Sequence, residues 1–139
     1  IDEAQAINDP ATLEELGLLL NYQVNDRFLL TFLLIGQPEL REQIGSIEQL
    51  EQRISIKFHL GPLKLDETKS YIQTRLEKVN CHLAIFTEDA MKAIHRNAKG
   101  IPRSINNICD ISLLLGFGSK TPDIGTGIVN KAASAIKQI

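Results

Sequence analysis

A continuous apolar run at residues 28–35 constrains the fold of this chain more than any other feature. Only Thr31 interrupts the run, which stops at Gly36, Gln37 and Pro38. A short apolar segment without alternation is typical of a strand buried on both faces of a parallel α/β sheet. A buried helix is the alternative, but the glycine and proline that follow favour a strand. Gln37 would then lie just past the carboxyl end of that strand, where open α/β sheets bind ligands, although its position alone favours a simple turn residue.

A second strand is expected over residues 54–60, where apolar and polar residues alternate as they do on a half-exposed edge strand. Helical spacing of apolar residues predicts helices on either side of the two strands, and past Pro62 it predicts helices only. The expected helices begin at Pro10, Pro38, about Ile47, Asp66, Thr87, Pro102 and Ile128. Asp9, Asp66 and Thr87 are the expected N-cap residues, because their side-chain oxygens can accept from free backbone N–H groups.

Composition is that of an ordinary globular domain. The 139 residues are 43% hydrophobic and 23% charged, which is enough for one core. No apolar run is long enough to span a bilayer, and no signal peptide is visible. Cys81 and Cys109 form no metal motif and are expected to be reduced, which suits the cytoplasm. Because the chain lacks an initiator Met and opens on what should be mid-sheet, we expect it to be a fragment of a longer protein.

Charge is divided unevenly along the chain. Residues 1–61 hold 4 basic and 10 acidic side chains, whereas residues 62–139 hold 11 basic and 7 acidic side chains. This shift predicts a boundary between an α/β part and a helical part. The basic half could face phosphates or nucleic acid, or it could be a solvated surface. Arg53, at a helix-to-strand junction, could likewise be a surface arginine neutralised by Glu48 or Glu51.

An acidic pair opens the chain. Ile1 is followed by Asp2 and Glu3, as at the end of a strand whose body is missing. This pattern is typical of the Walker B element of nucleotide-hydrolysing ATPases, where the first carboxylate serves Mg²⁺ and the second orients a water. Solvated surface charge and helix capping are the alternatives from these residues alone.

Several stretches, in one order and spacing, carry a resemblance to a known family. They are residues 1–5, 13–16 with 18–21, 36–40, 52–54, 59–63, 66–68 with 71–72 and 75–76, and 100–107. Through them the chain resembles AAA+ ATPases of the general secretion pathway protein A (ExeA) type, whose relatives include TniB-like transposition ATPases. Each stretch alone is weak evidence, but the ordered series covers nearly the whole chain.

The resemblance implies a role for each candidate site residue, with ATP and Mg²⁺ as cofactors. Asp2 would hold Mg²⁺ through water, and Glu3 would polarise the attacking water. Gln37 would be the sensor at the neighbouring strand end. Arg53 would be an arginine finger reaching a neighbouring subunit's nucleotide, and Arg103 a sensor in the helical lid. Arginine suits both positions because its planar fork grips phosphate oxygens bidentately.

The resemblance also implies an architecture and a setting. Residues 1–61 would be the C-terminal part of the AAA+ nucleotide-binding subdomain, a partial parallel sheet with helices, and residues 62–139 would be the helical lid. The parent protein would form a homo-oligomeric ring, in the cytoplasm or at the cytoplasmic face of the inner membrane. It would hydrolyse ATP to drive a secretion-pathway assembly. A transposition ATPase that associates with DNA, or a helical module that binds protein or DNA, remains the alternative.

One departure from the family is the missing P-loop. The pattern Gly-x-x-x-x-Gly-Lys-Ser/Thr is absent from the 139 residues, and neither Gly100–Arg103 nor Gly116–Lys120 replaces it. In this family the P-loop strand lies between the two strands expected here. We therefore expect the α/β part to be poorly stable by itself, and residues 1–139 alone to bind no ATP.

Overall fold

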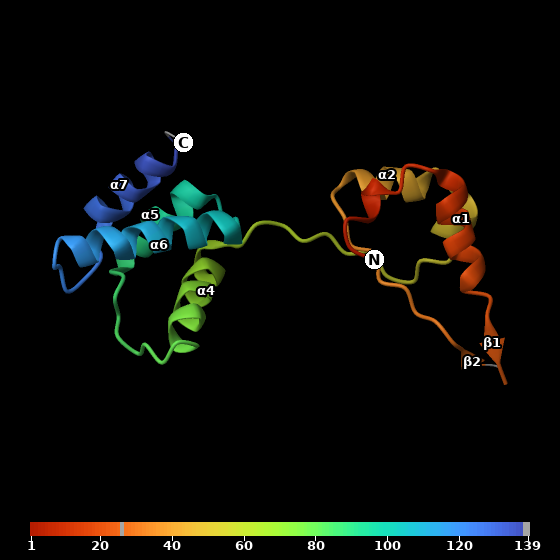
Figure 1. Ribbon diagram of the computed structural model, residues 1–139, viewed down its shortest axis with the longest axis horizontal. Helices are drawn as coiled ribbons and strands as arrows, with labels where there is room; N and C mark the ends of the chain where they lie inside the picture. The colour runs from red at the N-terminus through yellow and green to blue at the C-terminus, as the bar shows by residue number, and fades with distance from the viewer. Residues whose placement is uncertain (26, 138–139) are drawn as a thin grey trace. The chain divides into compact units, whose positions relative to one another are not determined.

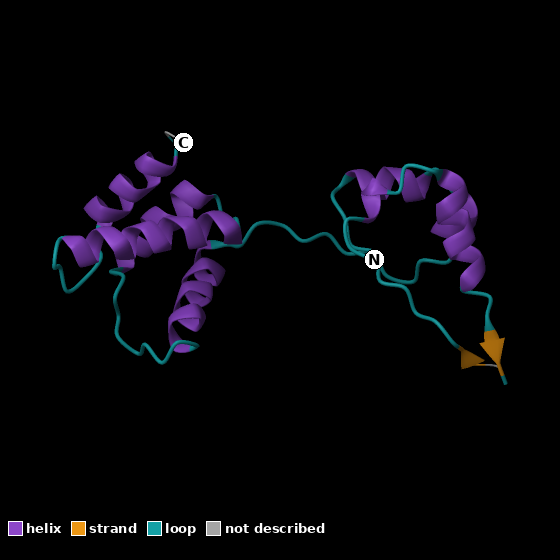
Figure 2. Ribbon diagram, in the orientation of Figure 1, coloured by secondary structure: helices purple, strands orange, loops and turns teal. Residues whose placement is uncertain are grey.

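The computed structural model describes residues 1–25 and 27–137. The chain divides into two compact units, which we call unit 1 (residues 1–59) and unit 2 (residues 60–139). Unit 1 contains a 3₁₀ helix, three α-helices and a small antiparallel hairpin, and unit 2 contains four α-helices (Figures 1 and 2). The elements are η1 (Ala4–Ala6), α1 (Pro10–Leu19), β1 (Gln23–Val24), β2 (Arg27–Phe28), α2 (Glu39–Gly45), α3 (Glu48–Glu51), α4 (Leu65–Glu77), α5 (Glu88–Ala98), α6 (Pro102–Gly118) and α7 (Thr126–Ile136).

Unit 1 is built around a small aliphatic core. Helix α1 begins as predicted, with Asp9 accepting from the backbone N–H of Ala11 at 3.1 Å and Pro10 at the first helical position. Its buried face packs on α3, and α3 packs on α2. The buried members of the core are Ala4, Leu13, Leu40, Ile44, Ile47 and Leu50.

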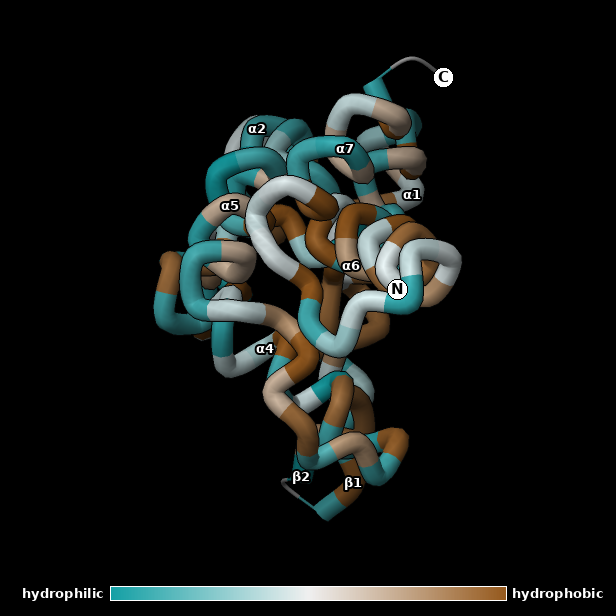
Figure 3. The backbone as a smooth tube through the Cα atoms, turned by 90° about the vertical axis from the view of Figure 1, so that its left-hand side faces the viewer, coloured by the Kyte–Doolittle hydropathy of each residue, from teal (hydrophilic) through white to brown (hydrophobic). Residues whose placement is uncertain are grey.

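The predicted strand over residues 28–35 is largely wrong. Only Phe28 belongs to a strand, as part of β2, which pairs antiparallel with β1. Leu33 is 69% exposed and Ile35 is 49% exposed, so the run is not buried on both faces. The apolar stretches around the hairpin are visible as brown tube in Figure 3. A strand is stable only when neighbouring strands satisfy its N–H and C=O groups, and residues 30–32 find no such partner among the described residues.

The end of the same run nevertheless pairs with the first residues of the chain. The N-terminal amine of Ile1 donates to Leu33 O at 2.8 Å, and Ile35 N donates to Ile1 O at 2.9 Å. Ala4 N then donates to Ile35 O at 2.9 Å. Donors and acceptors alternate between two segments that run in the same direction, as between parallel strands. We call these three bonds the parallel pairing.

The second predicted strand, residues 54–60, is also wrong. The described structure assigns no strand or helix there. Ile56, Phe58 and Leu60 are each 83% exposed, so the alternating pattern covers no core. As with residues 30–32, an extended segment without a neighbouring strand cannot form a ladder. The predicted partial parallel sheet is therefore reduced to the parallel pairing, and the only sheet within the described residues is the β1–β2 hairpin.

Unit 2 carries the larger core. Helix α6 packs against α7 and α5, and α4 packs against α5 and α6 (Figure 1). The loops that lead into α5 and α7 are joined by two backbone bonds, Thr87 N to Ile124 O at 3.1 Å and Ile124 N to Ile85 O at 2.7 Å. The buried residues of this core are Ile72, Phe86, Ala90, Ala93, Ile94, Ala98, Ile105, Ile108, Ile124, Val129 and Ala133.

Helices α5 and α6 of unit 2 begin where the sequence predicts, whereas α7 begins at Thr126, two residues before the predicted Ile128, and α4 lacks its predicted cap. Thr87 caps α5 as predicted, since its hydroxyl accepts from Ala90 N at 3.2 Å. Asp66 is not the cap of α4. The helix starts earlier, with Lys64 as N-cap, and the Glu67 carboxylate accepts from Lys64 N at 2.6 Å. That carboxylate satisfies the cap backbone and places negative charge on the first turn, which leaves Asp66 inside the helix.

Neither cysteine has a disulfide partner. Cys81 and Cys109 are both free and partly buried. Burial is the main cause that raises the pKa of the Cys109 thiol to about 12, with Asp110 adding to the shift. Cys109 therefore stays protonated at neutral pH and packs against the core of unit 2. In the described part of the chain, no helix is both long enough and apolar enough to cross a membrane.

Gly100 supplies the most specific test of the unit 2 fold. Its φ is +73°, and a Cβ there would lie 2.1 Å from Leu63 O. We expect Gly100→Ala to lower the free energy of unfolding of unit 2 by about 2 kcal/mol or more, from left-handed strain plus the clash. Amide hydrogen exchange in α5 and α6 measures this directly.

Gly118→Ala is the matched control. Gly118 ends α6, and a Cβ added there would meet no atom within 4 Å. Alanine has a higher helix propensity than glycine, by up to about 1 kcal/mol, so Gly118→Ala should leave amide exchange unchanged or slow it. Equal effects of the two substitutions would contradict the tight approach of Gly100 to Leu63.

Candidate functional site

The parallel pairing brings the acidic pair next to the end of the second segment. Asp2 and Glu3 lie between Ile1 and Ala4, whose backbones are bonded to Leu33 and Ile35. Gln37 follows Ile35 by two residues, so it lies at the same end of the parallel pairing as Asp2 and Glu3. We call Asp2, Glu3 and Gln37 the acidic edge. Chain segments separated by about thirty residues thus present two carboxylates and an amide at one end of a parallel pair, where α/β proteins place functional groups.

Glu3 has an unusual backbone conformation. Its φ and ψ are 51° and 38°, in the left-handed region that non-glycine residues rarely occupy. The Asp2 carboxylate accepts from Glu3 N at 2.9 Å, and Glu3 O accepts from Ala6 N at 2.9 Å. These bonds turn the chain from the extended segment directly into η1. Such a conformation costs about 1–2 kcal/mol, so the surrounding contacts must hold it.

Gln5 joins the two halves of the acidic edge. Its side-chain Nε2 donates to the Glu3 carboxylate, and its Oε1 accepts from Gln37 N at 3.0 Å. A Cβ at position 36 would lie 2.7 Å from Gln5 Oε1 and 2.8 Å from Leu40 Cδ2, so glycine leaves the space that these two side-chain ends occupy.

The acidic edge suits a hydrated divalent cation. Asp2 and Glu3 are exposed, and no ion pair engages either of them within residues 1–25 and 27–137. Mg²⁺ is commonly held through one or two carboxylates together with waters and substrate phosphates. The same residues do not suit a metal that needs an all-protein cage, since the described chain has no cluster of three metal-ligating side chains. The donor set thus fits the metal and water end of a nucleotide site.

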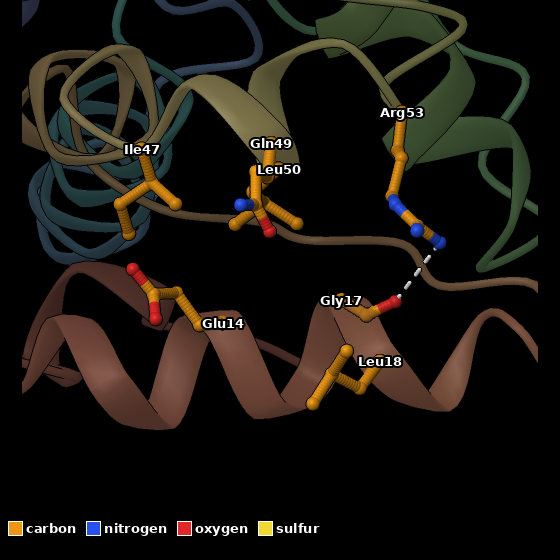
Figure 4. Close-up of a pocket in the computed structure, with 7 residues that line it drawn as sticks. All are labelled: Glu14, Gly17, Leu18, Ile47, Gln49, Leu50 and Arg53. Atoms are coloured by element: carbon orange, nitrogen blue, oxygen red, sulfur yellow. Dashed lines mark hydrogen bonds between the residues drawn. The ribbon is translucent and has the colours of Figure 1, made fainter.

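Arg53 lies elsewhere in unit 1, at a small hollow between α1 and α3. The hollow has a volume of about 20 Å³, which is room for one water. Figure 4 shows α1 on one side of it and the α3 segment on the other. Its lining residues are Glu14, Gly17, Leu18, Ile47, Gln49, Leu50 and Arg53.

Arg53 binds neither of the two glutamates that its sequence position offered. Its Nη1 donates to Gly17 O at 3.2 Å (Figure 4) and to Asn21 Oδ1 at 2.6 Å. Glu51 is paired instead with Lys57 at 2.5 Å, and this contact lowers the pKa of Glu51. Both Arg53 bonds use the same nitrogen. Within the part of the chain that the structure describes, Nε and Nη2 make no hydrogen bond.

Arg103 belongs to unit 2. It is the second residue of α6, directly after Pro102, and its side chain is exposed. Within unit 1 the structure therefore groups Asp2, Glu3 and Gln37 and gives Arg53 other surroundings. Gln5 and Gly36 complete the group although sequence reasoning gave them no role. The available signal was their position, each within two residues of a residue already singled out.

Comparison with known proteins confirms the resemblance that the sequence motifs carry. The whole chain is 39% identical to general secretion pathway protein A of Aeromonas hydrophila and covers 26% of that protein. It is also 28% identical to an uncharacterized HTH-type transcriptional regulator of Methanocaldococcus jannaschii, over 98% of this chain and 34% of the relative. The chain thus spans a quarter to a third of the length of these relatives. No protein-family model matches the chain, and no solved structure matches it significantly.

Arg53 should stabilise unit 1 in addition to any role at a nucleotide. Removing its two hydrogen bonds with Arg53→Ala should cost about 1 kcal/mol, the net value of exposed bonds, and speed amide exchange in α1 about 5-fold. The exposed Arg41, in α2, provides the control substitution Arg41→Ala. If amide exchange in α1 is equally fast in both variants, the contact between Arg53 and α1 does not stabilise unit 1.

Proposed function

We propose that these residues are part of an AAA+ ATPase of the general secretion pathway protein A type, which hydrolyses ATP to drive assembly of a secretion machine. The observation that carries the proposal is the acidic edge, where Glu3 and Gln37 meet at one end of a parallel pair and share the Gln5 amide. The similarity over the whole chain to a general secretion pathway protein supports it.

Each candidate residue has a role in this proposal. Asp2 would hold the hydrated Mg²⁺, and Glu3 would accept a proton from the attacking water. Gln37 would orient that water or touch the terminal phosphate, because an amide donates and accepts without adding charge. Arg53 would reach the nucleotide of a neighbouring subunit, and Arg103 that of its own subunit. Bound together with ATP, Mg²⁺ would neutralise charge that develops on the transferred phosphoryl group.

The geometry of Arg53 is compatible with such a finger. One nitrogen anchors the guanidinium to α1, which reduces the conformational freedom that a long exposed side chain would otherwise lose on binding. The two remaining nitrogens would present the planar fork that phosphate oxygens accept bidentately. An arginine finger acts on the nucleotide of a neighbouring subunit. The proposal therefore includes a ring of subunits.

The two units receive the roles that the resemblance implies. Residues 1–61 would be the C-terminal part of the AAA+ nucleotide-binding subdomain, and residues 62–139 the helical lid. The parallel pairing supports the first assignment, since it is the kind of contact that neighbouring strands of a parallel sheet make. The P-loop that cradles the α- and β-phosphates would have to come from outside these 139 residues. We place the parent protein in the cytoplasm or at the cytoplasmic face of the inner membrane.

A DNA-associated ATPase of the transposition type is the second candidate. Two observations favour it. Residues 62–139 hold 11 basic and 7 acidic side chains, and one relative is named as an HTH-type transcriptional regulator. Salt-dependent binding of duplex DNA by the parent protein would favour this candidate, since phosphate contacts release counterions. Binding that is absent at low salt would remove it.

Glu3→Gln in the full-length parent protein tests the proposed function. The amide keeps the shape of the carboxylate but cannot take a proton, so ATP hydrolysis should fall by about 10²-fold or more while ATP affinity stays within a few-fold. Steady-state phosphate release and a nucleotide-binding titration measure the two quantities.

Glu15→Gln is the matched control. Glu15 is an exposed acid of α1, outside the acidic edge, and the same chemical change there should leave hydrolysis unchanged. Hydrolysis that survives Glu3→Gln, or a parent protein that does not bind ATP, would contradict the proposal.

A further inference from the structure

We propose that Gln5 is a positioning residue, which fixes the Glu3 carboxylate relative to the segment end that carries Gln37. This inference rests on the proposed function and adds to it a residue that touches neither nucleotide nor water. Gln5 is half-buried and lies in η1, two residues past Glu3. Its amide is the only described side chain that bonds both halves of the acidic edge.

The chemistry of an amide explains why glutamine suits this position. Nε2 has two N–H donors, one of which reaches the Glu3 carboxylate, while Oε1 accepts from the backbone N–H of Gln37 at 3.0 Å. Glutamate at position 5 could still accept from Gln37 but would have no donor for Glu3. A hydrocarbon side chain of the same length could make neither bond. The two contacts can therefore be separated by substitution.

The backbone of Gln5 is itself held in place. Gln43 Nε2, from α2, donates to Gln5 O at 3.0 Å, and Ala4 N donates to Ile35 O at 2.9 Å. The absence of a Cβ at Gly36 leaves the space that Gln5 Oε1 occupies. The amide thus projects from a fixed backbone into a gap shaped for it.

Glu3 needs such support. It is exposed, its backbone is left-handed, and its side chain has three rotatable bonds. An exposed glutamate without a partner samples many rotamers, only some of which would point a carboxylate oxygen at an attacking water. The bond from Gln5 selects one orientation and ties it to the Gln37 segment. Loss of that bond should therefore reduce the rate of the chemical step rather than the affinity for nucleotide.

The test compares two variants of the full-length parent protein. In Gln5→Met, which removes both contacts at nearly constant volume, kcat for ATP hydrolysis should fall about 10-fold or more while KM changes less than about 3-fold. In Gln5→Glu, kcat should fall at least as far, because the donor to Glu3 is lost and a second carboxylate faces it. Gln73→Met, at an exposed position of α4, is the control for the same chemical change and should keep the kcat of the unaltered protein.

A second readout does not depend on activity. Hydrogen exchange of the Gln37 amide should speed up in Gln5→Met, which removes its acceptor, and should stay slow in Gln5→Glu, which keeps it. This split distinguishes a positioning amide from a residue that merely stabilises the fold, since general destabilisation would speed exchange in both.

The outcomes separate this inference from the proposed function. If Glu3→Gln abolishes hydrolysis but both Gln5 variants keep the kcat of the unaltered protein, the role of Gln5 is wrong and the proposed function stands. A loss carried entirely by KM would also overturn the positioning role. If Glu3→Gln leaves hydrolysis intact, the proposed function fails, and this role for Gln5 fails with it.

Discussion

The candidate site depends on three backbone hydrogen bonds between Ile1–Ala4 and Leu33–Ile35. Together with the Gln5 amide, they place the acidic pair beside Gln37, although the two stretches are more than thirty residues apart in the sequence. Ala4 is fully buried in the same aliphatic core as Leu40 and Ile44 of α2, so the pairing is anchored on the core at one end. The bonds themselves are ordinary in length, and a net value of about 1 kcal/mol each is comparable to the strain that Glu3 carries.

Around this pairing, side-chain hydrogen bonds form a chain that runs from the core to the surface. Gln43 holds the backbone of Gln5, Gln5 holds Glu3 and Gln37, and Glu3 ends in solvent with Asp2. Such an order combines rigid support with open carboxylates, which is what a hydrated cation and an attacking water require. The hydrogen-bonding capacity of the network is not fully used, because Gln43 Oε1 is buried and has no partner within the described residues. Unit 2 folds around its own, larger core and contributes Arg103 on an exposed helix start.

Local signals in the sequence predicted much of this structure, and signals that depend on distant partners did not. Asp9, Thr87 and Pro102 mark helix starts because a cap or a first-turn proline acts within four residues of chain. Asp66 failed as a cap because Glu67 satisfies the backbone of Lys64 better. The predictions of strands over residues 28–35 and 54–60 failed for a different reason. An apolar pattern indicates extended backbone, but a strand also needs an adjacent strand to form a hydrogen-bonded ladder. Within the site, the chemistry of Asp2, Glu3 and Gln37 could be anticipated from residue type. The part played by Gln5 could not, because it follows from hydrogen bonds to two segments that only the fold brings together.

Scalar couplings across hydrogen bonds measure the central claim directly. In an NMR experiment on the isotope-labelled chain, couplings should appear between Ile35 N and the Ile1 carbonyl carbon, and between Ala4 N and the Ile35 carbonyl carbon, since both N···O distances are 2.9 Å. Helix α6 provides the positive control within the same spectrum. Detection of both couplings would establish that the acidic pair and Gln37 share one edge. Their absence, with helical couplings present and rapid exchange of the Ala4 and Ile35 amides, would contradict the parallel pairing and the site built on it.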